Sequence, residues 1–319
     1  MSGLGLLFPG QGAQTVGMGR ALADAFPSAR DVFGRADEIL GFGLSKVCFE
    51  GPIDELTRTD VSQPAIFTAS LAALAALEEA GGPRREKAAA VAGLSLGEYT
   101  ALCAAGGIGF EDGLRLVRLR GEAMQAASTA KPSSMSSVVG LDDAGIQAAC
   151  AEASSAGIVS IANRNAPGQI VISGEIAALE TAEKACVARG ARRCIRLQVA
   201  GAFHSEVMRP AADRLARALE EVRIAEPRVP FLSNVTGARA TSAAEIRRNL
   251  ATQVCAPVLW EASMRAVLAS GLRSFVELAP AGVLAGLMRK IEASAQVEKC
   301  DGPDDAKRIA ASGAAAGAV

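Results

Sequence analysis

The chain has 319 residues, and its 33 basic and 34 acidic residues leave a formal net charge of −1. This near-balance gives no support for attraction to nucleic acid or to a membrane surface. Half of the residues are hydrophobic but only 4% are aromatic, so the core must be built mainly from Ala, Leu, Val and Ile. The length suits two average domains, or one large domain that carries an insertion.

Targeting signals and cysteine usage indicate the compartment. Residues 1–9 are apolar, but the segment is short and has no basic residue before it, so no secretory signal is predicted. The apolar stretch at 65–77 is too short to span a bilayer. The seven cysteines are dispersed and form no Cys-x-x-Cys pair, which argues against a disulfide framework or a zinc site. We therefore expect a soluble, cytoplasmic protein without a metal.

The first 130 residues alternate between predicted strands and helices. The expected order is a strand over 4–8, helices from about 19 and over 29–40, a helix opened by Ser62 through Glu79, a buried strand over 88–92, and a helix over 110–127. The loop at 10–14 has the first two glycines of a dinucleotide fingerprint, but Thr15 stands where the third is required. The loop is therefore predicted to end a strand and not to bind a dinucleotide.

Ser95 is the centre of a Gly-Leu-Ser-Leu-Gly run at 93–97, between the strand over 88–92 and a helix that starts near Leu96. A strand, a sharp turn and a helix lift a serine hydroxyl out of the backbone, and flanking glycines allow close approach of neighbouring chain. The N-terminus of the following helix favours a negative charge that develops beside the serine. The pattern therefore predicts a nucleophilic serine; the alternative is a glycine-rich turn with a solvated serine.

His204 is the only histidine in the chain. It follows a predicted strand, in a loop, and a protein that does serine chemistry with an imidazole base has no other candidate. A lone core or surface histidine is the alternative. No acidic residue can be assigned as a third member from spacing, and none is assigned.

Arg115, Arg118 and Arg120 lie on the helix that follows the serine run. They are either solvated residues of an amphipathic helix or include a guanidinium that grips a carboxylate through two hydrogen bonds. Arg189, Arg192 and Arg193 form a second basic group, which is either a solvated face or a contact for an acidic partner. The sequence leaves both choices open.

The middle of the chain has a different pattern. Its elements are predicted as strand 136–141, helix 143–154, strand 158–163, strand 169–173, helix 176–189 and strand 193–199. This β-α-β-β-α-β order is the ferredoxin-like order, and it indicates a small inserted domain. Beyond it we expect a helix over 210–222, a strand over 229–233, and a helix opened by Ser242 with the capping-box residue Glu245. The Ala- and Gly-rich tail, 301–319, is expected to be frayed and flexible.

Several short motifs, taken together and in order, resemble those of the malonyl-CoA:acyl-carrier-protein transacylase family. They are Phe-Pro-Gly-Gln-Gly at 8–12, Gly-Leu-Ser-Leu-Gly-Glu-Tyr at 93–99, Arg-Gly at 120–121 with Met-Gln at 124–125, Pro-Gly-Gln at 167–169, Gly-Ala-Phe-His-Ser at 201–205 and Ser-Asn-Val-Thr-Gly at 233–237. The resemblance runs from about residue 4 to residue 291. A series of this kind is far more specific than any one motif.

The resemblance implies an α/β fold: a large α/β-hydrolase-like catalytic domain (1–131 and 200–300) with a ferredoxin-like insert (132–199). It implies Ser95 as nucleophile and His204 as base. The other implied site residues are Gln11 and Leu96, whose backbone N–H groups would form the oxyanion hole, Arg120, which would bind the malonyl carboxylate, and Gln253, whose backbone carbonyl would orient the histidine. Phe203, beside the histidine, matches the malonyl-selective pattern.

The chain departs from the family pattern at four places. Leu94 stands where a histidine is usual, Ser-Ser-Met at 133–135 replaces Gly-Ala-Met, Ala-Pro-Ala-Gly at 279–282 replaces Gly-Pro-Gly-Lys, and Glu206 replaces a frequent proline. These departures leave the reaction class intact but make the choice of carrier less certain.

The resemblance implies ping-pong transfer of malonyl from malonyl-CoA to an acyl carrier protein, by a monomer that needs no metal or bound organic cofactor. Two alternatives remain: an acyl hydrolase or an acyltransferase of a polyketide pathway with another acyl or carrier preference, and a non-enzymatic scaffold that binds the carrier. Whether the malonyl group feeds fatty-acid or polyketide synthesis is not readable from the sequence.

Overall fold

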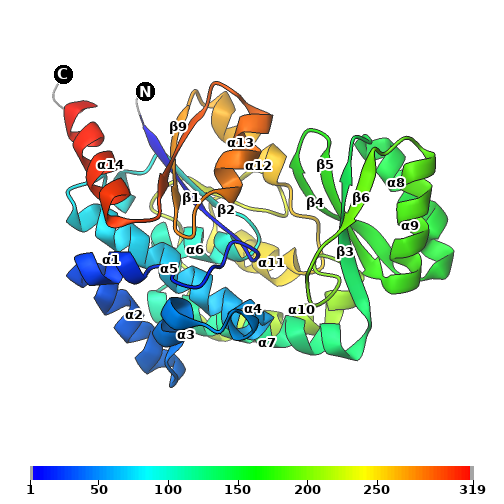
Figure 1. Cartoon of the computed structure of the whole chain (residues 1–319), viewed down its shortest axis with the longest axis horizontal. Helices are drawn as coiled ribbons and strands as arrows, with labels where there is room; N and C mark the ends of the chain where they lie inside the picture. Colours follow the sequence, from blue (N-terminus) through cyan, green and yellow to red (C-terminus); the bar gives the residue numbers. More distant parts are fainter. Residues whose placement is uncertain (1–2, 317–319) are drawn as a thin grey trace.

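The structure is a computed structural model that describes residues 3–316, with side chains described to residue 312. Two sheets lie side by side: a large one formed by both ends of the chain, and a small one formed by its middle, in green (Figure 1). The large sheet has the order β10-β9-β1-β2-β7-β8. Its strands are β1 (Leu4–Phe8), β2 (Ala90–Gly93), β7 (Phe231–Leu232), β8 (Arg239–Ala240), β9 (Ser274–Leu278) and β10 (Gln296–Cys300).

The central strands of the large sheet are parallel, and only the edge pair β7–β8 is antiparallel. Leu6, Leu7 and Phe8 of β1 are buried, as expected for a parallel strand covered on both faces. Phe8 is in register with Gly93 of β2, so the loops that leave these two strands start next to each other. The carboxyl ends of β1 and β2 thus define one edge of the sheet, where ligands bind in open parallel sheets.

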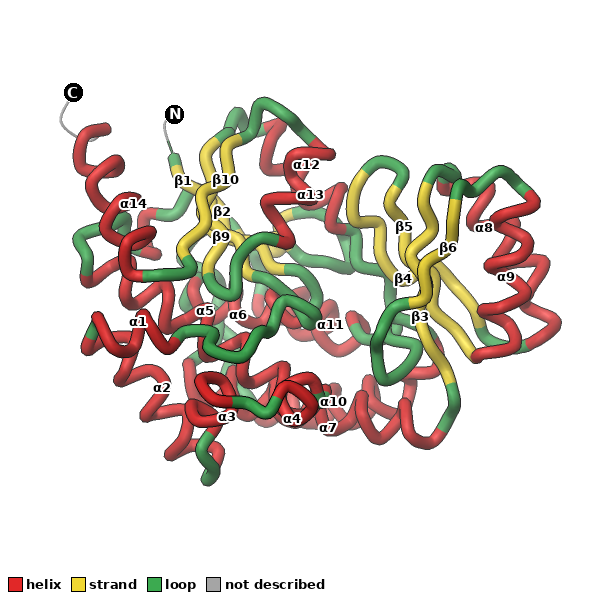
Figure 2. Tube along the Cα trace, viewed as in Figure 1, coloured by secondary structure: helices red, strands yellow, loops and turns green. Residues whose placement is uncertain are grey.

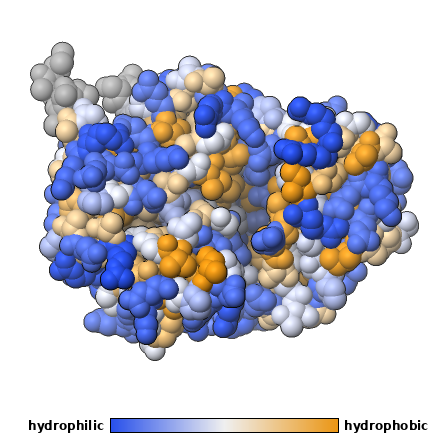
Figure 3. All heavy atoms as spheres, viewed as in Figure 1, coloured by the Kyte–Doolittle hydropathy of each residue, from blue (hydrophilic) through white to orange (hydrophobic). Residues whose placement is uncertain are grey.

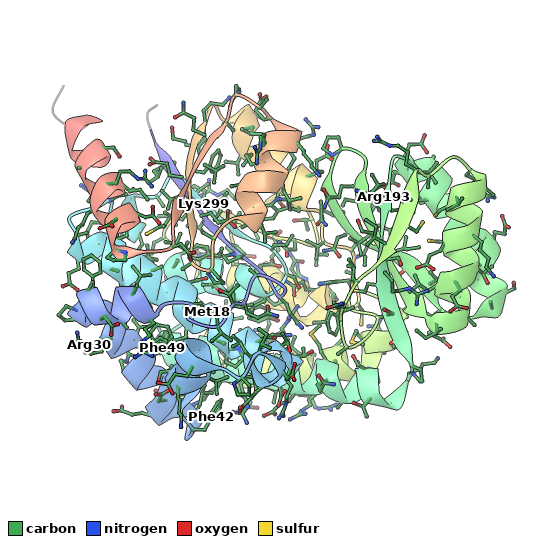
Figure 4. All side chains as sticks on the ribbon, in the orientation of Figure 1. Met18, Arg30, Phe42, Phe49, Arg193 and Lys299 are labelled. Carbon is green, nitrogen blue, oxygen red and sulfur yellow. The ribbon has the colours of Figure 1, made fainter. Side chains whose placement is uncertain are left out.

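Helices cover the large sheet on both faces (Figures 1 and 2). They are α1 (Arg20–Ala25), α2 (Pro27–Leu40), α3 (Leu44–Glu50), α4 (Ile53–Thr57), α5 (Thr59–Glu79), α6 (Leu96–Ala104), α7 (Phe110–Ala130), α10 (Arg209–Glu221), α11 (Ala243–Gln253), α12 (Trp260–Ala269), α13 (Val283–Ile291) and α14 (Pro303–Ala316), with short 3₁₀ turns at Arg85–Lys87 and Glu206–Met208. Aromatic contacts tie the N-terminal helices together: Phe49 lies edge-on to Phe33, with centroids 4.8 Å apart, and Phe42 lies under Arg118 (Figure 4).

Helix α5 is the central helix of the fold. It starts at Thr59, three residues before the predicted Ser62, because Val61 and Ser62 already donate to the carbonyl of Arg58. Pro64 therefore lies inside the helix and not in its first turn. By length and composition α5 could cross a membrane, contrary to the sequence expectation from 65–77, but 89% of its apolar window is buried inside the protein. It is thus packed as a core helix.

The small sheet is antiparallel, with the order β4-β5-β3-β6, and α8 and α9 cover one of its faces (Figure 2). Its elements follow the predicted order, as β3 (Ser133–Val139), α8 (Asp143–Ala153), β4 (Val159–Ala166), β5 (Gln169–Glu175), α9 (Ile176–Ala188) and β6 (Arg193–Arg196), with a 3₁₀ turn at Ser154–Ala156. It has a hydrophobic core of its own around Val138, Ile146 and Ile172.

Several strand boundaries of the small sheet differ from prediction: β3 ends at Val139 and not at 141, β4 ends at Ala166 and not at 163, and β5 ends at Glu175 and not at 173. β3 begins at Ser133 and not at 136, since Ser133 is already paired with Glu175 of β5. β6 ends at Arg196 and not at 199, because the pairing with β3 stops there and residues 197–200 turn toward the large sheet.

Backbone hydrogen bonds link the small sheet directly to the large part of the chain. Val258, in the segment before α12, donates to the carbonyl of Ala162 at 2.8 Å and accepts from the N–H of Arg164 at 2.9 Å. Both partners lie in β4, so this strand is held against the large part of the chain by its own backbone. The spacing of the two sheets is therefore constrained.

The expectation of a flexible tail from residue 301 is wrong for most of that segment. Pro303–Ala316 forms α14, and Ala306, Ile309 and Ala310 are buried against the hydrophobic core. The spacing of these three residues is that of one helix face, which explains why an Ala-rich segment packs instead of fraying. Residues 317–319 lie outside the described part of the chain.

Candidate active site

Ser95 occupies a strained turn between β2 and α6. Its φ is 54° and its ψ is −103°, values that few non-glycine residues adopt. The turn is closed by glycines: a Cβ on Gly93 would lie 1.9 Å from the backbone of Gly97, and one on Gly97 would lie 2.1 Å from the carbonyl oxygen of Phe8. The strand, turn and helix predicted around the serine are therefore present, and only glycine fits at both flanks.

His204 meets Ser95 across 109 positions of the chain. Its Nε2 lies 2.8 Å from Ser95 Oγ, and its Nδ1 lies 2.8 Å from the backbone carbonyl of Gln253. A carbonyl oxygen only accepts, so Nδ1 carries the proton and Nε2 is free to accept from the serine hydroxyl. The pair has the geometry of an activated nucleophile, with a carbonyl in the place of an acidic third member.

The imidazole is buried and neutral. Burial, and then the charge of Arg120, lower the pKa of His204 from 6.5 to about 4, against the opposing effect of the backbone groups of Gln253 and Ala256. A histidine with this pKa is a base throughout the neutral range.

Arg120 is the one arginine of α7 that enters the site. Only 1% of it is exposed, and its Nη2 donates to Ser95 Oγ at 3.0 Å and to Gln253 Oε1 at 2.9 Å. Its Nη1 donates to Gln63 Oε1 at 2.7 Å, and no carboxylate forms a salt bridge with it among the described residues. A buried guanidinium whose hydrogen bonds go to neutral amides and a hydroxyl makes no direct ion pair, which suits an anionic ligand.

The other two arginines of α7 are surface residues. Arg115 pairs with Glu111, and Arg118 pairs with Glu122, on the exposed side of the helix. A signal in the sequence could have separated them from Arg120. Positions 113, 116, 117, 120 and 124 follow helical spacing and form the buried face, on which Arg120 is the only charged residue.

Gln11 and Leu96 lie on the two adjacent loops that leave β1 and β2. Leu96 is the first residue of α6, where the N–H group has no acceptor within the helix. The loop of Gln11 runs close to the serine turn, because a Cβ on Gly10 would lie 2.4 Å from the carbonyl oxygen of Leu94. The side-chain amide of Gln11 donates to Thr59 at 3.4 Å, and its backbone N–H donates to no acceptor within the described part of the chain.

A cavity of about 490 Å³ opens above these residues, between the two sheets. It appears in Figure 3 as the deep hollow between the large and the small part of the molecule. The large part contributes Gln11, Ser95, Arg120 and His204 to its lining. The small part contributes Met135, Asn163, Asn165, Val171 and residues 197–200. Four of the six candidate residues thus converge on a single cleft with a mixed polar and apolar wall, whereas Leu96 and Gln253 lie behind them and do not line it.

Three buried polar residues of the site have no role assigned from the sequence. Asn234 accepts from the N–H of Ser95 at 2.7 Å and donates to the carbonyl of Gly93 at 2.8 Å, which fixes the turn from both sides. Gln63 holds Arg120. Glu98 is fully buried and accepts from Asn234 and from Gln253. These residues come from three distant segments, and no spacing in the sequence connects them.

Of the four departures from the family pattern, only Leu94 lines the cleft. Ser133 Oγ accepts from the N–H of Ala202, two residues before the histidine. Glu206 pairs with Arg209 on the surface. Beside Gly282, the ammonium of Lys299 lies 3.1 Å from the position that a Cβ would take (Figure 4). A cation from β10 therefore occupies the space next to position 282.

Among the described residues, no group of three or more His, Cys, Asp or Glu side chains could hold a metal ion.

Comparison with known proteins places the chain among acyl transferases. Residues 6–304 match the acyl transferase domain family. A malonyl CoA-acyl carrier protein transacylase of Bacillus subtilis is 41% identical over 292 residues, which cover 91% of each chain. The solved structure of an acyl-carrier-protein S-malonyltransferase from Bartonella henselae superposes with a TM-score of 0.93 at 38% identity, covering 97% of this chain and 99% of that one. A malonyl-transacylase solved with the holo acyl-carrier protein of a type II polyketide synthase superposes with a TM-score of 0.92 at 38% identity, covering 98% and 100%.

Proposed function

The chain belongs to the acyl transferase domain family, and we propose that it transfers a malonyl group from malonyl-CoA to the phosphopantetheine thiol of an acyl carrier protein. The observation that carries the proposal is the convergence of Ser95, His204 and a buried, carboxylate-free Arg120 at the floor of one cleft. The first two residues supply a nucleophile and its base. The third, Arg120, supplies a buried positive charge that favours an acyl group ending in a carboxylate.

In the first half-reaction, His204 Nε2 takes the proton of Ser95 as its hydroxyl oxygen attacks the thioester carbonyl of malonyl-CoA. The C–S bond breaks, and the imidazolium returns the proton to the departing CoA thiolate. A malonyl ester on Ser95 remains. The 2.8 Å contacts on both ring nitrogens support this assignment, since the carbonyl of Gln253 fixes the tautomer that the base requires.

The oxyanion of the tetrahedral intermediate is assigned to the backbone N–H groups of Gln11 and Leu96. Both groups lie at the adjoining carboxyl ends of β1 and β2, and the first turn of α6 adds the positive end of its dipole. Donors of this kind act on charge that develops in the transition state.

Arg120 is assigned to the malonyl carboxylate. A short acyl group such as acetyl would leave the guanidinium without an anion in a largely dry site, which disfavours its transfer. In the second half-reaction the phosphopantetheine thiol gives its proton to His204 and attacks the ester, and Ser95 leaves with that proton. The carrier then departs with the malonyl group.

Further expectations accompany this function. The large part of the chain, 1–131 and 200–300, is proposed to be α/β-hydrolase-like, and 132–199 to be a ferredoxin-like insert, on the basis of their strand orders. The enzyme is proposed to act in the cytoplasm as a monomer, without a metal or bound organic cofactor.

Intact mass spectrometry after incubation with malonyl-CoA, and then with holo acyl carrier protein, tests the function. We expect one malonyl adduct on the wild type, its transfer to the carrier, and no adduct on Ser95→Ala. If the adduct is hydrolysed and the carrier is not loaded, the protein is a hydrolase and not a transferase. If no acyl-CoA gives an adduct, the protein is a scaffold that binds the carrier.

A further inference from the structure

The carboxyl group of Glu98 is at the centre of the polar network beneath the active site. It lies in the first turn of α6, one turn after Ser95, and none of it is exposed. Oε1 accepts from the backbone N–H of Asn234 at 3.2 Å, and Oε2 accepts from Nε2 of Gln253 at 2.5 Å. A carboxyl group is costly to bury, so its place here calls for an explanation.

The two partners of Glu98 hold the reacting groups. Asn234 binds the backbone N–H of Ser95 through its side chain. Gln253 binds the Ser95 carbonyl through Nε2 at 2.8 Å, and its own carbonyl holds His204 Nδ1. Glu98 touches neither the serine hydroxyl nor the imidazole, yet it fixes both of the residues that place them.

Glu98 is also the carboxyl group whose charge acts on Arg120. The guanidinium donates to Oε1 of Gln253, while the amide nitrogen of the same side chain donates to Glu98. A chain of guanidinium, amide and carboxylate therefore crosses the floor of the site. The charge of Arg120 is balanced through one intervening amide and not by a direct ion pair, so its outer edge stays open toward the cleft.

We propose that Glu98 is a positioning residue, which sets His204 and the Ser95 turn through Gln253 and Asn234 and balances Arg120 until the carboxylate of the substrate arrives. The second part of this assignment rests on the proposed function. The first part depends only on the hydrogen bonds of Glu98, Asn234 and Gln253.

If the charge of Glu98 balances that of Arg120, binding of malonyl-CoA at Arg120 is linked to protonation of Glu98. Burial raises the pKa of Glu98 from 4.5 to about 7, opposed by hydrogen bonds from Gln253, Asn234 and Ser233 and by the charge of Arg120. The other titratable neighbours are Tyr99, next to it in α6, and His204, which shares Gln253. A malonyl carboxylate on Arg120 cancels part of the charge that favours ionised Glu98, so the protonated form binds malonyl-CoA more tightly. KM for malonyl-CoA then rises as the pH increases through 7.

The variant Glu98→Gln tests both parts, with Glu277→Gln as its matched control. Glu277 is likewise fully buried and accepts two N–H groups, those of Leu284 and Ala285 at the start of α13, but it touches none of the residues above. An amide at position 98 places an NH₂ group against a donor, so one of the two hydrogen bonds is lost.

Because His204 is the only histidine, its ring signals in a ¹⁵N-labelled sample need no assignment by mutation. We expect Glu98→Gln to shift the Nδ1–H signal, to lower the rate constant of acylation about tenfold to a hundredfold, and to remove the rise of KM between pH 6 and 8, about one unit on either side of the pKa of the wild-type residue. Glu277→Gln is expected to change none of these.

A His204 signal and an acylation rate equal to those of the wild type would overturn the positioning role. A KM that rises with pH in the variant as it does in the wild type would overturn the balancing role. If Glu98→Gln does not fold, Gln253→Met breaks the same bridge and keeps the backbone carbonyl. The His204 signal and the acylation rate then decide the positioning role, and the pH dependence of KM in the wild type decides the balancing role: a KM that does not rise through pH 7 would overturn it. If the wild type forms no malonyl ester, the proposed function fails, while the His204 signal still decides the positioning role.

Discussion

The guanidinium of Arg120 donates a hydrogen bond to the hydroxyl of Ser95 over 3.0 Å, on the same oxygen that faces His204 at 2.8 Å. The group proposed to select the acyl chain therefore contacts the proposed nucleophile itself. If the substrate carboxylate binds Arg120 as proposed and draws the guanidinium away from the hydroxyl, that oxygen is left to the imidazole alone.

Replacing Arg120 should change which acyl group is transferred. We expect Arg120→Ala to lower kcat/KM for malonyl-CoA at least about a hundredfold, because the carboxylate loses its partner, and to increase transfer of acetyl or longer acyl groups relative to malonyl. Competition between malonyl-CoA and acetyl-CoA, read by mass spectrometry of the loaded carrier, measures this preference. Arg118→Ala is the matched control on the same helix, since Arg118 pairs with Glu122 outside the cleft. An unchanged preference in Arg120→Ala would refute the assignment.

The pH dependence of acylation should show the lowered pKa of His204. Its neutral form is the base, and its pKa is about 4 in the folded protein, so loss of the base should slow acylation only as the pH approaches 4, well below any change near pH 7 that comes from Glu98. Single-turnover acylation of Glu98→Gln, measured across pH, isolates the decrease that His204 causes, and titration of the single histidine by NMR gives its pKa directly. A pKa of His204 near the ordinary value of 6.5 would contradict a buried, neutral imidazole.

The strained turn at Ser95 should cost stability. With φ at 54°, glycine fits the conformation better than serine or alanine. We expect Ser95→Gly to raise the free energy of unfolding above that of Ser95→Ala by about 1 kcal/mol, with acylation absent in both. Urea unfolding monitored by circular dichroism makes the comparison. Equal stability of the two variants would show that the turn is relaxed.

Gly93 should tolerate no side chain. A Cβ there would meet the backbone of Gly97 at 1.9 Å, so Gly93→Ala is expected to lower the free energy of unfolding by about 3 kcal/mol and to displace Ser95. Gly34 lies inside α2 with nothing within 4 Å of the corresponding position, and Gly34→Ala should stabilise by about 0.5–1 kcal/mol. Urea unfolding of both variants measures these two changes in the free energy of unfolding. If the serine turn can shift to make room for a Cβ, Gly93→Ala will not be destabilised relative to Gly34→Ala.

The C-terminal helix should contribute to stability. Ile309 of α14 is buried, and Ile309→Ala is expected to lower the free energy of unfolding by about 2–3 kcal/mol. Lys307 is exposed on the same helix, and Lys307→Ala should have little effect. If the two variants unfold alike, the segment is loosely attached, as the composition of the tail suggested.

The sequence predicted those features that are local. The turn at 93–97 combines a buried strand, two glycines and a helix start in nine residues, and the β-α-β-β-α-β order follows from alternating patterns over short distances. The short helices α3 and α4 were not predicted, because segments of 7 and 5 residues show too few turns for a helical period to appear. The start of α5 was placed three residues late since Pro64 was taken as a first-turn residue.

The polar floor of the site could not be predicted in the same way. Glu98 meets Gln253 across 155 positions, and Arg120 meets Gln63 across 57. Such contacts depend on how helices pack on the sheet, which no local pattern encodes. The resemblance to a family pointed to the backbone carbonyl of Gln253, but its side chain, which bridges Arg120 and Glu98, carries a second task that is visible only in three dimensions.

The order of the site along the chain has a consequence for synthesis on the ribosome. The nucleophile at 95 precedes the middle sheet, the base at 204 follows it, and the carbonyl that orients the base comes another 49 positions later. A nascent chain that has emerged only through the middle sheet therefore carries a serine without an imidazole. If Ser95 and His204 act as proposed, acylation is expected only after the segment through Gln253 has been synthesised and has folded against the serine turn.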